Sequence, residues 1–112
     1  LYEYDGSEQW RHTATKALVH LARRGDYQNP TLPDQWYLLA LDRWIQSFGE
    51  GADRATLDLL LEHARQLCRD MVQEQQPQFD VAPLAGCFTP EGRTCPSATR
   101  LEGLLAALRF LP

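Results

Sequence analysis

The segment 35–48 (QWYLLALDRWIQSF) constrains the fold of this chain more than any other stretch. At about 100° per residue, its apolar side chains cover nearly the whole circumference of a helix, and Asp42 and Arg43 are its only charged residues. A helix that is apolar nearly all round lies inside a protein. We therefore expect protein to surround this helix on nearly every side, with Trp36 and Trp44 on one face of it and both in the core.

Amphipathic helices are predicted before and after this segment. The first begins at an N-cap, Ser7, and ends near Gly25. Its apolar stripe consists of Trp10, Ala14, Ala17, Leu18 and Leu21. The third opens at Asp53, carries an apolar seam from Leu57 to Val72 and cannot continue past Pro77. Each of these two helices is predicted to bury one face.

Two helix starts are marked by capping residues and prolines. Thr31 is the expected N-cap before the segment 35–48, with Pro33 in the first turn. Cys95 or Ser97 is the expected cap of a last helix. The apolar stripe of that helix consists of Leu101, Leu104, Leu105, Leu108 and Leu111.

The order of elements is helix, short turn, helix, short turn, helix, long loop, helix. Short connections make consecutive helices antiparallel. The sequence therefore predicts an all-α fold of two antiparallel helical hairpins, with a long loop over residues 77–95 between the third and fourth helices. At 112 residues one domain is expected. Because the first residue is Leu1, residues 1–112 are either a single helical domain or a piece of a larger helical protein.

Charge and hydropathy exclude some partners. The net charge of −4 comes without a basic patch, which argues against nucleic acid and against an anionic membrane surface. No apolar run approaches the roughly 20 residues that span a bilayer. The expected partners are the rest of a longer chain, another protein, or a second copy of this chain. Whether the protein is cytoplasmic or exported stays open.

Three features resemble a known superfamily. The lead-in 2–5 (YEYD) precedes a helix, a buried second helix follows, and a loop rich in glycine and proline leads into 98–104 (ATRLEGL). This arrangement resembles part of an (α/α) toroid, the six-hairpin helical barrel of many glycosidases, sugar epimerases and terpene cyclases. The resemblance covers about two hairpins, so the remaining hairpins of a complete toroid would have to come from elsewhere.

The resemblance implies a function. In such toroids the loops at one end build the active site, and residues 77–95 are similar to such a loop. The chain would then be the helical-hairpin portion of a protein that handles a carbohydrate or another small organic substrate. The candidate catalytic residues are Glu91, Arg100 and Glu102, and the candidate substrate-binding residues are Asp80, Phe88 and Arg93. No catalytic motif of a particular toroid enzyme is present, so whether the chain is an enzyme stays open.

A second function, from a different class, fits the same pattern. The chain would be a non-enzymatic protein-interaction module that docks through its leucine-rich helices onto a partner or a second copy. A flat apolar patch formed by Leu101, Leu105 and Leu108 would favour docking. A cavity lined by the polar candidates above would favour substrate handling.

Cysteine and histidine spacing leaves one open alternative. Cys87 and Cys95 flank a proline–glycine turn, and they are either joined as a disulfide or remain free thiols. His12, His20 and His63 show no spacing typical of zinc sites, and no C-x-x-C motif is present. No metal and no cofactor are therefore predicted.

Overall fold

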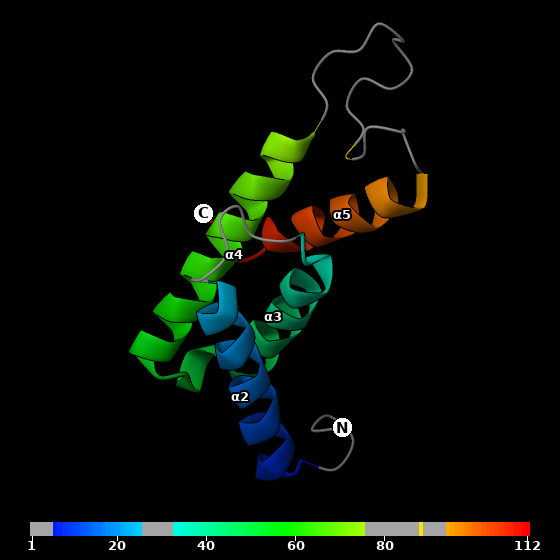
Figure 1. Ribbon diagram of the computed structural model, residues 1–112. Coiled ribbons are helices and arrows are strands. Elements are labelled where there is room, and N and C mark those ends of the chain that lie inside the picture. Colours follow the sequence, from blue (N-terminus) through cyan, green and yellow to red (C-terminus); the bar gives the residue numbers. More distant parts are fainter. Residues whose placement is uncertain (1–5, 26–32, 76–87, 89–93) are drawn as a thin grey trace, which may run out of the picture.

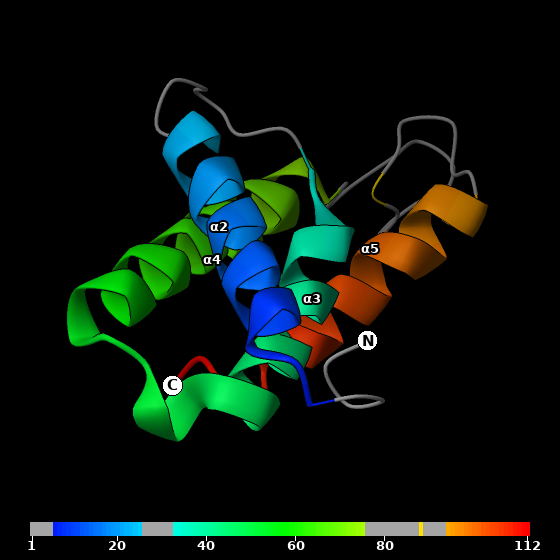
Figure 2. The same cartoon turned by 90° about the horizontal axis from the view of Figure 1, so that it is seen from below.

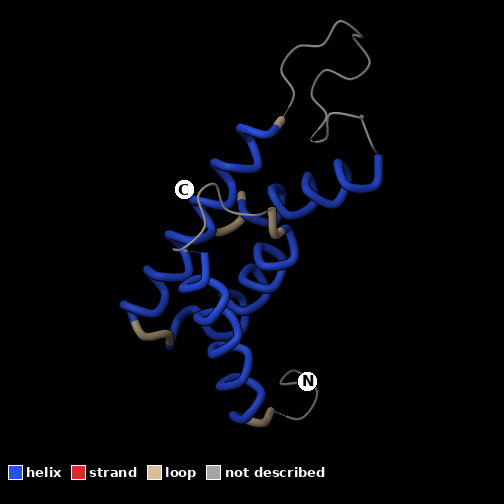
Figure 3. The backbone as a smooth tube through the Cα atoms, in the orientation of Figure 1, coloured by secondary structure: helices blue, strands red, loops and turns tan. Residues whose placement is uncertain are grey.

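The computed structural model describes residues 6–25, 33–75, 88 and 94–112, and within these ranges it contains helices and no strand (Figures 1 and 3). The elements are α2 (Glu8–Gly25), α3 (Gln35–Phe48), the 3₁₀ turn η1 (Gly49–Gly51), α4 (Arg54–Glu74) and α5 (Thr94–Ala107). The predicted all-α fold with four α-helices is confirmed.

Two aspartates begin the central helices. The Asp53 carboxylate accepts hydrogen bonds from the Thr56 backbone N–H at 3.0 Å and from the Thr56 hydroxyl at 3.1 Å, as the sequence predicted for the start of α4. The Asp34 carboxylate accepts from the Tyr37 backbone N–H at 3.0 Å and caps α3. The prediction of Thr31 as N-cap, with Pro33 in the first turn, is therefore wrong: Pro33 precedes the helix, and Thr31 lies outside the described residues.

The last helix begins before the caps predicted for it and ends before the last leucine of its predicted stripe. Because α5 starts at Thr94, Cys95 and Ser97 lie inside its first turn and are not caps. The helix ends at Ala107, and Leu111 lies beyond it, although its backbone N–H still donates to the Ala107 carbonyl at 2.9 Å. Leu111 is therefore not part of the helical stripe.

The two hairpins pack across one another. Figure 2 shows α3 between α2 and α5, with α4 crossing behind α2. The most extensive contact between elements joins α3 to α5, and the next joins α2 to α4. Each hairpin is therefore stabilised chiefly by the other hairpin rather than by its own second helix.

Gly103 permits the closest approach in that contact. A Cβ atom at Gly103 would lie 2.6 Å from the Gln35 Cβ and 2.8 Å from the Gln35 Cα, which is closer than side chains tolerate. The absence of a side chain thus lets α5 lie directly on the first turn of α3. A hydrogen bond from Gln35 Nε2 to Thr99 Oγ1 at 3.4 Å lies beside this contact.

The core lies where α2, α3, α4 and α5 meet. Its buried apolar residues are Leu18, Ala22, Tyr37, Leu38, Leu41, Trp44, Leu60, Ala64, Leu67, Met71 and Ala107. Trp44 is 6% exposed, which confirms its predicted place in the core. Its indole N–H donates to the Thr15 hydroxyl at 2.9 Å, and that hydroxyl donates to the Arg11 carbonyl at 2.8 Å. The polar edge of the buried indole is thereby satisfied.

The prediction that Trp36 belongs to the core is wrong. Its side chain is 64% exposed. Ala40, Arg43 and Ser47, which follow at helical spacing, are exposed as well. Since α2, α4 and α5 cover the other sides of α3, one face of this helix is open among the described residues. The expectation that protein surrounds α3 on nearly every side is wrong for this face.

Within the described part of the chain, no helix is both long and apolar enough to cross a lipid bilayer.

Candidate interaction surfaces

A row of exposed leucines runs along α5 and ends at Leu108, the first residue after the helix, whose backbone N–H still donates to the Leu104 carbonyl at 3.3 Å. Leu101, Leu105 and Leu108, called here the leucine stripe, are 49%, 53% and 74% exposed. Their spacing places them on one side of the helix. Gly103, Ala106 and Ala107 are buried and lie on the opposite side, against the rest of the molecule. α5 is therefore apolar on two sides, and only one of them is covered by the described residues.

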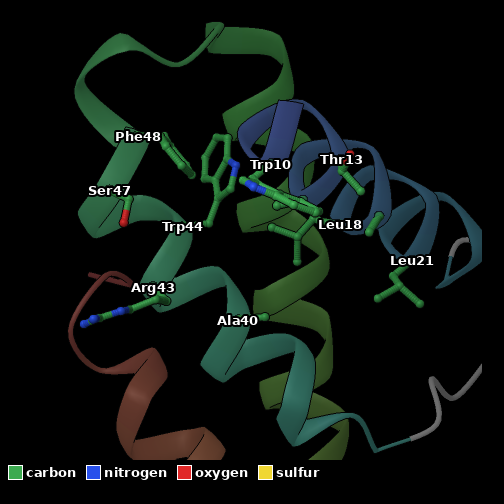
Figure 4. Close-up of a pocket in the computed structure, with 11 residues that line it drawn as sticks. Trp10, Thr13, Leu18, Leu21, Ala40, Arg43, Trp44, Ser47 and Phe48 are labelled. Atoms are coloured by element: carbon green, nitrogen blue, oxygen red, sulfur yellow. The ribbon is translucent and has the colours of Figure 1, made fainter. Parts of the chain in front are cut away.

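A second apolar surface lies between α2 and α3. The two helices enclose a groove with a volume of about 640 Å³ (Figure 4). The residues that line the α2–α3 groove are Trp10, Thr13, Ala14, Ala17, Leu18, Leu21, Ala40, Arg43, Trp44, Ser47 and Phe48. All five residues of the stripe that the sequence predicted to be buried on α2 therefore line this groove.

Aromatic rings form one end of the groove. The Trp44 and Phe48 rings meet edge to face, with 6.1 Å between their centroids. The guanidinium of Arg11 lies 5.9 Å from the centroid of the Phe48 ring, within the range of a cation–π contact. Trp10, which the sequence placed in the core, is only partly buried and lines this groove. Leu21 lies eleven residues further along α2 and lines the opposite end (Figure 4).

Small side chains keep the groove open. Ala14 and Ala17 on α2 and Ala40 on α3 all line it, and all three are exposed. Larger residues at these positions would fill the space between the helices. The sequence predicted that Ala14 and Ala17 lie on a buried face, and their small size was the signal that could have indicated a groove.

Of the two polar residues predicted as site candidates at the start of α5, Arg100 has a structural role. Arg100 lies 3.1 Å from a Glu74 carboxylate oxygen, and its guanidinium also donates to the Phe88 carbonyl. The Arg100 side chain is 19% exposed, so this ion pair is partly shielded from solvent. It links α5 to the end of α4. Glu102 is exposed, and neither residue lines the groove.

The other predicted site residues are only partly placed. Phe88 is buried at 7% exposure, and its backbone N–H donates to the Ser97 hydroxyl at 3.3 Å. Asp80, Glu91 and Arg93 lie outside the described residues. A substrate site that joins them to Arg100 and Glu102 stays a prediction.

Of the two cysteines that the sequence predicted as possible disulfide partners, the structure describes only Cys95. Cys95 is exposed, and Cys87 lies outside the described residues, so the alternative between a disulfide and free thiols stays open. His12 and His20 are exposed, whereas His63 packs edge to face against Tyr37 with ring centroids 4.7 Å apart. In the ranges that the structure describes, no three His, Cys, Asp or Glu residues are grouped as a metal site would require.

The perturbed pKa values have structural causes away from both apolar surfaces. Hydrogen bonds from Arg69 and then Arg65 lower the pKa of the Glu62 carboxyl, which lies on the exposed side of α4. Burial raises the pKa of the Cys68 thiol. Burial, followed by the charge of Asp34, raises the pKa of the Tyr37 phenol. These shifts do not mark either apolar surface as a catalytic centre.

Comparison with protein families, with characterised proteins and with solved structures finds no match. The resemblance to (α/α) toroids therefore stays a prediction.

Proposed function

We propose that this chain is a non-enzymatic helical interaction module, which docks through the leucine stripe of α5 onto an apolar helical groove of another polypeptide. The proposal takes the second of the two functions that the sequence left open. A ridge of leucines at helical spacing is the usual way in which one helix anchors itself in a groove between others.

The exposure of the leucine stripe is the observation that supports this proposal. Single exposed leucines are ordinary on protein surfaces, but three in one row form a continuous apolar patch. Covering the exposed half of three leucine side chains would contribute roughly 2–4 kcal/mol to association. The opposite side of α5 is packed through Gly103, so the helix presents the stripe from a fixed position.

The toroid-derived function rests on other residues. It requires a cavity that gathers Asp80, Glu91 and Arg93 with Arg100 and Glu102. No contact among the described residues favours that arrangement over docking, because Arg100 is engaged by Glu74 and Glu102 faces solvent. Handling of a carbohydrate or another small organic substrate stays a prediction from the resemblance.

Hydroxyl-radical footprinting tests the docking function. Oxidation of Leu101, Leu105 and Leu108 is measured by mass spectrometry, first in the dilute purified chain and then inside the cells that make it. Val72 of α4 is 54% exposed and lies outside the stripe, so it serves as an internal control of similar chemistry.

We expect the three leucines to be protected several-fold in cells, while Val72 is oxidised equally in both samples. Equal oxidation of the stripe in both samples would overturn the proposal, because a docking surface in use is shielded from solvent.

A further inference from the structure

The described part of the chain has two uncovered apolar surfaces of opposite shape. The leucine stripe is a ridge, and the α2–α3 groove is a trough. We infer that the two are partners, and that the stripe of one copy seats in the groove of a second copy. The inference builds on the proposed docking function and names the surface that receives the stripe.

The lengths of the two surfaces agree. From Leu101 to Leu108 the stripe covers eight residues, and the seven steps between its ends correspond to about 10 Å along a helix axis. The α3 side of the groove runs from Ala40 to Phe48, which is about 12 Å. The groove is therefore long enough for the whole stripe. A leucine at one end of the stripe would then contact the aromatic end of the groove.

The shapes agree as well. The distance between packed helices depends on the size of the side chains at their contact. Ala14, Ala17 and Ala40 are small and exposed, so a helix that enters the groove can approach both walls closely. The branched side chains of the stripe then fill the space that the alanines leave. Indole and phenyl rings at one end supply the broad contact area typical of interface anchors.

The stripe cannot reach the groove of its own chain. α5 packs on α3 through Gly103, and the stripe is on the opposite side of α5. α3 lies between α2 and α5, so α3 and the body of α5 separate the stripe from the groove (Figure 2). Only another molecule can bring the two surfaces together.

Charge is consistent with the pairing. Glu102 is exposed beside the leucine stripe, and Arg43 lines the groove. Arg109, seven residues after Glu102, is exposed on the same flank. Glu102 of one copy can therefore approach Arg43 in the groove of another, and this contact between opposite charges favours encounter.

Two variants with matched controls test the inference on the full chain. Leu105→Asp places a charge in the stripe, and Ala17→Glu places one in the groove. Val72→Asp and Ala55→Glu make the same changes at exposed positions of α4 outside both surfaces. Association is followed by sedimentation velocity from nanomolar to millimolar concentration, with circular dichroism to show that each variant is folded. Leu101→Asp and Ala14→Glu repeat the test if either first variant is unfolded.

The decisive sample is an equimolar mixture of the two surface variants. We expect the wild-type chain and both controls to associate, and each surface variant alone to have a dissociation constant weaker by about tenfold or more. In the mixture, the intact groove of one variant can accept the intact stripe of the other, so heterodimers form. This contact is heterologous, and in the wild type it closes into a dimer or ring or continues into longer assemblies.

Two results would overturn the inference. A wild-type chain that remains monomeric over the whole range has no such contact, and the protection of the stripe in cells then decides the docking function separately. A groove variant that still associates while the stripe variant does not would show stripe-to-stripe contact, which retains the docking function and excludes the groove as its partner.

Discussion

Trp36 and Trp44 of α3 are eight residues apart on one helix, yet Trp44 is 6% exposed and Trp36 is 64% exposed. Eight residues at 3.6 per turn leave about 80° between the two side chains. That angle turns Trp44 towards α2 and Trp36 towards the open face. Residue type and helical pattern alone do not distinguish these two positions, because the neighbours that cover a helix come from elsewhere in the chain.

The largest expected effect is on the buried tryptophan. Trp44→Ala should lower the free energy of unfolding by about 3–5 kcal/mol, since it removes a large core side chain and leaves a cavity. It also leaves the Thr15 hydroxyl without the indole N–H that donates to it. Urea unfolding followed by circular dichroism measures the loss. A loss below about 1 kcal/mol would mean that the core does not depend on this ring.

The next effect concerns the other side of α3, where α5 lies. Gly103→Ala should destabilise the fold by about 1–3 kcal/mol, because the new Cβ meets backbone as well as side-chain atoms of Gln35. This outcome is opposite to the usual gain from replacing glycine in a helix.

Gly51→Ala is the matched control for that change. A Cβ at Gly51 meets no atom within 4 Å, so stability should change by no more than about 0.5 kcal/mol or rise slightly. A neutral Gly103→Ala would show that the contact between α3 and α5 is looser than described.

A smaller effect is expected at Tyr37, which is buried one residue after Trp36. Its hydroxyl donates to the Leu60 carbonyl at 3.0 Å, so Tyr37→Phe should cost about 0.5–1.5 kcal/mol near neutral pH. The change leaves the ring and its contact with His63 in place.

The same residue predicts a pH dependence. Because burial raises the pKa of Tyr37 above the ordinary value of about 10, the unfolded chain releases the phenol proton at a lower pH than the folded chain does. The stabilisation is complete below about pH 10 and decreases as the pH rises above it. Unfolding at neutral and alkaline pH should show a shallower alkaline loss in Tyr37→Phe, and equal losses in both proteins would contradict the assignment.

The smallest effect is expected at the exposed tryptophan. Trp36→Ala should change the free energy of unfolding by no more than about 0.5 kcal/mol, because most of its surface is already hydrated. Trp36 fluorescence can be measured alone in a Trp10→Phe, Trp44→Phe background and should show an emission maximum near that of free indole. A large loss of stability would mean that another part of the protein covers this face.

The sequence was most informative where the signal was local. The bounds of α3 follow from its run of apolar residues, and the start of α4 follows from Asp53, because caps and periodicity depend on neighbours in the chain. Whether an apolar residue is covered depends on distant helices. The sequence therefore placed Trp36 in the core, and it did not predict that Ala14 and Ala17 would line a groove.

The candidate site could be predicted only in part. Leu101, Leu105 and Leu108 were recognised as one row from their spacing, and the structure leaves them exposed. The groove was not predicted, because it requires the relative position of two helices. The use of Arg100 as a link to Glu74 also depends on a contact between α5 and the end of α4, which no pattern in either segment indicates.

The contact at Gly103 has a consequence for the energetics of recognition. In the docking that we propose, a helix held against the first turn of α3 does not have to fold or reorient when its outer leucines meet a partner, so little conformational entropy is lost on binding. Affinity should then respond to a substitution at a position that no partner touches. Loosening α5 at Gly103 would weaken association by making the stripe mobile before contact is made.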